Sequence, residues 1–292
     1  MNLEEKQEIT SSWFKNLRNL ICAEFEAIEA EYFNSSNRPI ALEYQTLPKF
    51  TRKNWDRKDA ANEDGGSGEM SVMKGNVFEK VGVNFSKVYG DFSEQFRSQI
   101  PGTEKSGKFW ASGISLVAHM RSPLVPATHM NTRFICTEKT WFGGGGDLNP
   151  MFEDEKDTKD FHQAFKIACD KADKNYYEKF KKDCDEYFFI KHRGVSRGVG
   201  GIFYDYLNSG NFENDLEFTK NVGLAFLEIF PKLVRRHMFE SWNDEQREHQ
   251  LRKRGFYTEF NLLYDRGTKF GLMTNGNTEA ILMSLPPVAK WD

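Results

Sequence analysis

The sequence predicts an α+β fold, in which an antiparallel β-sheet is covered by α-helices. Three observations predict it. Stretches with helical periodicity occur near the start and in the second half of the chain, strand-like runs lie between them, and short turns join several of those runs. This order favours α+β over a doubly wound parallel sheet, which would alternate strand and helix. We expect one domain that spans residues 1–292.

Four helices are expected from apolar residues that recur every three or four positions. The first is a long amphipathic helix over Phe14–Tyr32, and the next two cover Asp157–Asp183 and Leu216–Met238. A shorter charged helix is expected over Asp244–Arg254. Gly255 should end it, because glycine suits a left-handed cap.

Strands are expected where β-branched and aromatic residues run between turn signals. The runs are Met70–Lys74, Gly75–Glu79, Ser112–Arg121, Thr128–Glu138, Glu186–His192, Gly201–Leu207, Phe256–Tyr264, Thr268–Met273 and Glu279–Leu285. The charged, glycine-rich stretch Lys58–Glu69 is expected to be a surface loop.

Composition and charge exclude several classes of protein. With 40 Lys and Arg against 43 Asp and Glu, the net charge of −3 lacks the basic excess of a nucleic-acid binder. No apolar run approaches the roughly 18 residues of a membrane span, so we expect no span. The acidic N-terminus is unlike a signal or transit peptide, which predicts a cytoplasmic protein. Four scattered cysteines are expected to be reduced thiols.

Two neighbouring runs sort polar from apolar residues with a period of two. Because an antiparallel hairpin would bring the polar sides together, they should form one cationic face free of acidic residues. That face suits an anion, since Arg side chains bind carboxylates with paired hydrogen bonds. A solvated sheet face is the alternative. The residues of the predicted face are Ser115, His119, Arg121, His129, Asn131 and Arg133.

Three other stretches carry polar or glycine-rich patterns. Lys191–Gly201 combines cations with glycines and could approach a carboxylate ligand closely. Gly143–Gly146 could form an amide nest, but a flexible turn is the more common reading. Glu259, Asn261 and Asp265 would share one face of a strand.

Metal-binding motifs of the HExxH type and an HxD/E start of an iron triad are both absent from the sequence. Histidines scattered along the chain could still converge in space. These are His119, His129, His162 and His192.

Six ordered motifs resemble the oxygen-dependent coproporphyrinogen III oxidases over nearly the whole chain. The motifs are Gly75–Ser86, His129–Arg133, Trp141–Pro150, Arg197–Asp205, Glu259–Leu272 and Glu279–Pro287.

The resemblance implies an enzyme of haem biosynthesis. It would oxidatively decarboxylate two propionates of coproporphyrinogen III to vinyl groups, with O2 as oxidant and protoporphyrinogen IX as product. It also implies a large antiparallel sheet flanked by helices on both faces, a deep cleft, a homodimer and no organic cofactor. The cationic face would then meet the four carboxylates of a flat macrocycle.

The resemblance also assigns residues. It implies substrate contacts at Ser115, Asn131, Thr132, Arg133, Asn275, Gly276 and Asn277. His129 corresponds to a proton donor, and the four histidines named above correspond to proposed ligands of a divalent metal such as manganese. Arg197 is expected to act in catalysis together with His129. Thr132 should point away from the His129 face, so it would contact substrate through its backbone.

We favour a mechanism without metal, because a metal-bound histidine could not readily be both ligand and acid. A carboxylate, Asp265 or Asp205, would polarise or deprotonate a pyrrole NH. Two other functions stay open at this point. They are a non-catalytic tetrapyrrole-binding protein and a metal-dependent hydrolase that uses the four histidines.

Overall fold

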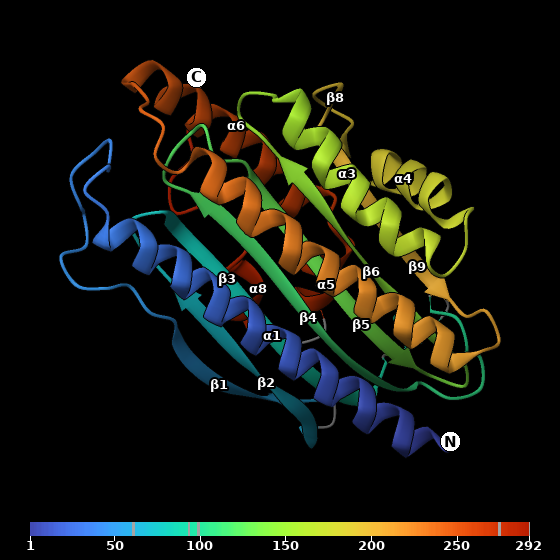
Figure 1. The fold of residues 1–292 in the computed structure, drawn as a ribbon. Helices are drawn as coiled ribbons and strands as arrows, with labels where there is room; N and C mark the ends of the chain where they lie inside the picture. Colours follow the sequence, from blue (N-terminus) through green and yellow to red (C-terminus); the bar gives the residue numbers. More distant parts are fainter. Residues whose placement is uncertain (60–61, 93, 98–99, 274–275, 292) are drawn as a thin grey trace.

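A seven-stranded antiparallel sheet forms the centre of the fold, in the order β1-β2-β3-β4-β5-β6-β9 (Figure 1). The computed structural model describes residues 1–59, 62–92, 94–97, 100–273 and 276–291. The antiparallel α+β prediction is confirmed. The strands are β1 (Thr51–Lys58), β2 (Asp64–Met73), β3 (Phe78–Asp91), β4 (Lys108–Met120), β5 (Ala127–Cys136), β6 (Thr140–Asn149) and β9 (Gly200–Leu207), and a separate hairpin pairs β7 (Phe189–Ile190) with β8 (Val195–Ser196).

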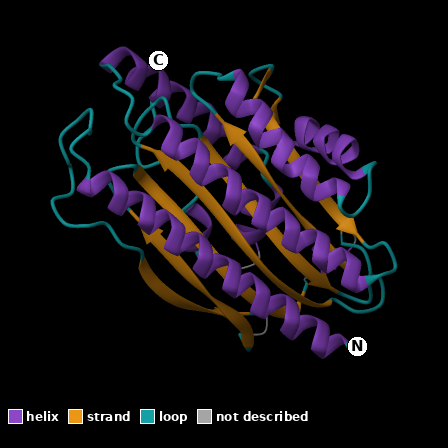
Figure 2. Cartoon of the chain, viewed as in Figure 1, coloured by secondary structure: helices purple, strands orange, loops and turns teal. Residues whose placement is uncertain are grey.

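One face of the sheet lies under a layer of helices (Figures 1 and 2). Alternating apolar side chains of β4, such as Ile114, Leu116 and Ala118, point into this layer and are almost fully buried. Packing against the helices therefore fixes which side chains face the opposite side. The layer consists of α1 (Leu3–Asn34) and α5 (Phe212–His237), with α3 (Glu155–Asp170) and α4 (Tyr176–Tyr187) beside β9.

The opposite face carries the C-terminal helices, which confirms that helices flank both faces. Figure 1 shows α8 behind the strands, on the far side from α1 and α5. Met283 lies against Gly82 of β3, where an added Cβ would stand 2.7 Å from the methionine sulfur. The helices of this side are α6 (Asp244–Leu263), α7 (Arg266–Met273) and α8 (Thr278–Leu282), while the short α2 (Glu94–Arg97) precedes β4.

The three strands predicted at the C-terminal end are wrong, because this part of the chain is helical. In α6 the buried residues Tyr257, Phe260 and Asn261 follow helical spacing. The run Phe256–Tyr264 reads equally well as a buried strand, since short apolar runs do not distinguish the two structures. The predicted shared strand face of Glu259, Asn261 and Asp265 is therefore also wrong.

Gly255 does not end a helix, because α6 continues through it to Leu263. Its role is steric, since an added Cβ would lie 2.7 Å from the carbonyl oxygen of Lys290. The C-terminal segment crosses the helix at this point, and the amide of Lys290 donates to the carbonyl of Leu251 at 3.0 Å. Only glycine leaves room for this close approach.

The predicted loop and turn near the strands are also corrected. Most of the stretch 58–69 belongs to β1 and β2, which pair antiparallel. Gly143–Gly146 is not a flexible turn but the middle of β6. The helix expected over Asp157–Asp183 is two helices, α3 and α4, separated at residues 171–175. The four cysteines are free thiols, as predicted, and the structure buries all four.

Candidate active site

The two polar runs lie side by side on adjacent strands, as predicted. Ser115 of β4 is paired with Asn131 of β5, and Val117 is paired with His129. Directly paired residues point to the same side of an antiparallel sheet, so these polar side chains share the face opposite to α1 and α5. Arg121 is an exception, because β4 ends at Met120. Its guanidinium binds Glu43 and the carbonyl of Gly75 instead.

Glycines of β6 make room for the polar side chains of β5. An added Cβ on Gly143 would lie 2.8 Å from the Arg133 guanidinium carbon, and one on Gly146 would lie 2.9 Å from the Phe165 ring. The backbone of β6 is thus approached closely from both faces, which explains its run of glycines. The same strand brings Asp147 opposite His129.

A chain of hydrogen bonds orients His129. Arg133 Nη1 donates to Asn131 Oδ1 at 3.0 Å, which turns the amide nitrogen of Asn131 toward His129 Nε2 at 3.1 Å. An amide nitrogen can only donate, so Nε2 accepts and carries a lone pair. The proton of the neutral ring therefore sits on Nδ1, which donates to Asp147 Oδ1 at 2.9 Å.

Asp147 is buried and held as an anion. Burial raises the pKa of its carboxyl, but the charge of Arg197 and the hydrogen bond from His129 outweigh it and lower the pKa to about 2. Arg197 contacts both carboxylate oxygens through Nη2, at 2.7 and 2.8 Å, and donates to Asn261 Oδ1 at 3.1 Å. Its guanidinium also lies 3.9 Å from the centre of the Phe188 ring.

Arg197 is therefore placed against Asp147 and not on the open polar face. Its side chain is only 2% exposed. The structure brings it to the site as a partner of the acid that holds His129, while Arg133 is 28% exposed and faces outward from the sheet. Of these two guanidinium groups, Arg133 is the more accessible to a ligand.

Asp205 lies beside Arg133, although β6 separates its strand, β9, from β5. Its Oδ1 is 3.0 Å from Arg133 Nη2, and its Oδ2 is 3.8 Å from Arg266 Nη2. The Arg133 guanidinium also stands 5.9 Å from the centre of the Phe203 ring. Asp205 is followed by Tyr206 with a φ of 55°, a conformation that costs energy for a residue with a side chain and is often found at functional sites.

Asp265 has a different environment. It follows α6 and accepts hydrogen bonds at the start of α7, from the Tyr187 hydroxyl at 2.9 Å and the Thr268 amide at 2.6 Å. Both carboxylate oxygens are thus engaged in holding α7. Asp205 is the carboxylate that the structure places next to Arg133.

The four histidines do not gather at one place. His119 Nε2 bonds the carbonyl of Ser284 at 2.8 Å, and His162 lies between Val199 and Tyr177. His192 bonds Glu259 and Tyr264. Within the described ranges, no group of three His, Cys, Asp or Glu side chains is arranged to hold a metal ion. These four side chains do not fit a shared metal within one chain.

The other predicted substrate residues are placed as follows. Thr132 points to the helix-covered side of β5 and is fully buried, as its position in the strand predicted. The side chain of Asn277 accepts from the Ala280 amide at 2.9 Å and caps α8. The amide of Gly276 bonds the carbonyl of Gly271 at 2.9 Å. Asn275 lies outside the described residues.

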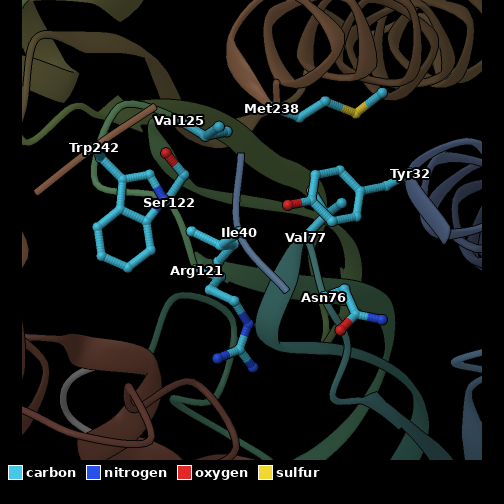
Figure 3. Close-up of a pocket in the computed structure, with 9 residues that line it drawn as sticks. All are labelled: Tyr32, Ile40, Asn76, Val77, Arg121, Ser122, Val125, Met238 and Trp242. Carbon is cyan, nitrogen blue, oxygen red and sulfur yellow. The ribbon is translucent and has the colours of Figure 1, made fainter. Parts of the chain in front are cut away.

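A small pocket lies apart from this face (Figure 3). Its one cation, Arg121, is already bound to Glu43 and Gly75, and none of its side chains belongs to the hydrogen-bonded chain around His129. We therefore assign no function to it. The pocket is lined by Tyr32, Ile40, Asn76, Val77, Arg121, Ser122, Val125, Met238 and Trp242.

Sequence reasoning missed Asp147, the acid nearest to His129. The polar face was expected to lack acids because only two strands were considered. The signal was present in the sequence, since Asp147 follows Gly143 and Gly145 at alternate positions. Reading the glycine run as a strand would have placed all three residues on one face.

Comparisons with known proteins agree with one another. The family profile described as "Coproporphyrinogen III oxidase" matches residues 10–292. A protein of Rickettsia bellii named oxygen-dependent coproporphyrinogen-III oxidase is 62% identical over 288 residues, 99% of both chains. Proteins with the same name are 61% identical over 288 residues, again 99% of both chains, in Rickettsia akari, and 60% identical over 292 residues, all of both chains, in Rickettsia africae. None of the helices that the structure describes combines the length and the hydropathy of a membrane span.

Proposed function

The chain belongs to the coproporphyrinogen III oxidase family, and from this premise we propose that it performs the reaction for which its relatives are named. Two propionates of coproporphyrinogen III become vinyl groups, and protoporphyrinogen IX is formed for haem biosynthesis. For each side chain, one propionate, one O2 and one proton give one vinyl group, CO2 and H2O2. The observation that carries this proposal is the face on which Arg133, Asn131 and His129 are joined to a buried anion, Asp147.

Arg133 is the main group for binding a propionate in this proposal. Its guanidinium is partly exposed and is already oriented by Asn131 and Asp205. A carboxylate of the substrate would meet two parallel N–H donors there, which is the geometry that Arg provides best. Ser115 shares the face, and the backbone of Thr132 and residues 275–277 complete the contacts that the resemblance implies. We expect the macrocycle to lie in a deep cleft over this face.

His129 and Asp205 divide the proton transfers. At rest His129 has a lone pair on Nε2 and a proton on Nδ1, so it first accepts a proton and then returns it. Asp147 stabilises the charged ring formed in between, and Arg197 keeps Asp147 ionised. Both are positioning residues in this scheme, because neither reaches the reacting atoms.

Asp205 is the carboxylate that we assign to the pyrrole NH. Of the two candidates it is the one beside Arg133, whereas Asp265 is occupied at the start of α7. Removing that proton makes the ring more electron-rich, and O2 then adds to it. The peroxide on the ring takes a proton from the propionate methylene next to the ring, and the ring carbon–oxygen bond breaks with hydroperoxide as the leaving group. CO2 then leaves as the vinyl double bond forms, and Asp205 returns its proton to the pyrrole nitrogen. One further proton converts hydroperoxide to H2O2, which gives the balance stated above.

The reaction needs no organic cofactor in this proposal, and we derive no step through a metal. The four histidines have separate partners, and His129 is already engaged at both nitrogens. A buried acid beside the cationic face also favours an enzyme over a passive carrier. A carrier of carboxylates needs positive charge there, and a buried anion would weaken its binding.

We further propose a cytoplasmic homodimer. The residues that were predicted as C-terminal strands form helices. Exposed apolar side chains instead lie at the ends of α6 and α7, at Leu262, Leu263, Leu272 and Met273. Exposed apolar side chains are often covered by a second copy in symmetric oligomers.

One assay separates this proposal from its alternatives. Purified protein is incubated with coproporphyrinogen III with and without O2, and porphyrin product, CO2 and H2O2 are measured. We expect turnover only with O2 and equal amounts of CO2 and H2O2. Binding without turnover would identify a carrier, and release of product without O2 would identify a hydrolase.

A further inference from the structure

The C-terminal end of α8 is tied to the sheet by side chains of two adjacent strands. His119 of β4 bonds the carbonyl of Ser284 at 2.8 Å, and Lys80 of β3 donates to the carbonyl of Leu285 at 2.8 Å. His119 and Lys80 are direct partners in the β3–β4 pairing, so both point to the same face. Between these carbonyls and α8, Met283 packs over Gly82.

The contact fixes the role of the His119 ring. A carbonyl oxygen can only accept, so Nε2 carries the proton and donates it to Ser284. The side chain is buried, and the ring of Tyr257 packs edge-on against it at 5.0 Å between centres. Nδ1 is buried without a hydrogen-bond partner, but the described residues hold no group of ligands that would make a metal site around it.

The hydrogen bonds from His119 and Lys80 also affect the turn that is expected to contact substrate. Asn277 caps α8, and the helix that follows it has only five residues, which at 1.5 Å per residue is about 7.5 Å long. A rigid piece of this length transmits the position of its C-terminal end to its first residue. Fixing Ser284 and Leu285 therefore also fixes Gly276 and Asn277.

We propose that His119 is a positioning residue that docks α8, and with it the turn at Gly276 and Asn277, onto the sheet. It is not a metal ligand. The effect on turnover rests on the proposed function, because it assumes that this turn meets a substrate carboxylate. The docking itself does not depend on that assumption.

The test uses the full chain with His119→Ala, His119→Gln and Lys80→Met. The Gln amide places a donor near the position of Nε2, whereas Ala removes the donor. Hydrogen exchange of residues 278–285 is measured first. We expect exchange about tenfold faster in His119→Ala and in Lys80→Met, the change that loss of one hydrogen bond produces, and near-normal exchange in His119→Gln.

His162→Ala is the matched control, since His162 also bonds a backbone carbonyl, that of Val199, through Nε2. It should leave exchange in residues 278–285 unchanged. Unaltered exchange in His119→Ala would overturn the docking, whatever the enzyme does. Faster exchange throughout the chain in His119→Ala, without the same local effect in Lys80→Met, would also overturn it.

Kinetics and elemental analysis complete the test. We expect KM to rise about tenfold in His119→Ala, with a smaller change in kcat, and to recover in His119→Gln. The metal content per chain should be equal in all variants. Loss of a bound metal in both His119 variants would overturn the proposal in favour of a ligand role. If the unmodified protein shows no turnover, the proposed function fails, and the exchange data still decide the docking.

Discussion

At the residue scale, the state of His129 is set by neighbours that do not form a motif in the sequence. Arg133 determines which end of the Asn131 amide faces the ring, and the amide then determines which ring nitrogen accepts a hydrogen bond. The other ring nitrogen, Nδ1, carries the proton and donates it to Asp147. A change at any member of this chain should therefore alter the chemistry of His129 even when the ring stays in place.

Arg133→Ala should weaken substrate binding by about 1.5–3 kcal/mol, because a propionate would lose a charge-assisted partner. That loss is about a 10- to 150-fold rise in KM. Steady-state kinetics measure it, with Arg133→Lys as the control that keeps the charge but not the paired donors. KM and kcat both within twofold of the unmodified enzyme would contradict the assignment.

Asp147→Asn should destabilise the fold by about 3–5 kcal/mol at pH 7, because it leaves the buried Arg197 without its counter-charge. The pKa of Asp147 is about 2 in the folded state, below its ordinary value of 3.8, so the stabilisation is complete above pH 4 and declines as the pH falls toward 2. Urea unfolding of both proteins at pH 7, 4 and 3 should show a difference that narrows with acid. A difference that stays constant would show that the charge of Asp147 contributes nothing.

At the scale of the elements, periodicity predicted those helices and strands in which buried and exposed residues alternate regularly along the element. The first helix and the β4–β5 pair have regular apolar stripes, and the structure has them as predicted. β6 was missed because glycine has a low strand propensity. The glycines of this strand are explained by the close approach of Arg133 and Phe165 to its backbone. The C-terminal helices were missed because their short apolar runs fit the period of a strand as well as the period of a helix.

The site was predictable to a similar extent. The polar alternation on β4 and β5 is enough to identify Ser115, His129, Asn131 and Arg133 from the sequence alone. Asp147 and the pairing of Arg133 with Asp205 depend on which strands are neighbours across the sheet. That order is a tertiary property, which no local pattern contains.

Gly255→Ala tests the close approach of the C-terminal segment to α6. Helix propensity alone predicts a gain of about 1 kcal/mol in stability. We expect a loss of about 1–3 kcal/mol instead, because the added Cβ would lie 2.7 Å from the Lys290 carbonyl oxygen. Urea unfolding measures the sign, and in a control chain that ends at Pro287 the same substitution should stabilise. Stabilisation in the full chain would refute the steric explanation.

At the scale of the whole molecule, the four histidines are dispersed among different elements. His119 lies on β4, His129 on β5 and His162 on α3, while His192 lies between β7 and β8. We expect activity to survive exhaustive chelation, measured as porphyrin formation in metal-free buffer with the metal content of the protein determined in parallel. Loss of turnover that manganese restores would show that the histidines act in metal binding after all.

The assembly should depend on the exposed apolar side chains at the C-terminal ends of α6 and α7. Leu263 is 52% exposed, and Leu224 of α5, in the opposite helix layer, is 42% exposed. Because the two leucines differ little in exposure, Leu224→Glu is a matched control for Leu263→Glu. Both substitutions add the same charge at a similarly exposed position, but on different faces of the molecule.

We expect a dimer of about twice 33.9 kDa by light scattering, which Leu263→Glu dissociates and Leu224→Glu leaves intact. Dissociation should also lower turnover, since α7 begins at the Arg266 that lies near Asp205 and loses its support when the interface opens. A fully active monomer at micromolar concentration would refute the dimer. Dissociation by Leu224→Glu alone would place the interface on the helix layer of α1 and α5. Dissociation would then not be expected to change turnover, because that layer covers the other face of the sheet.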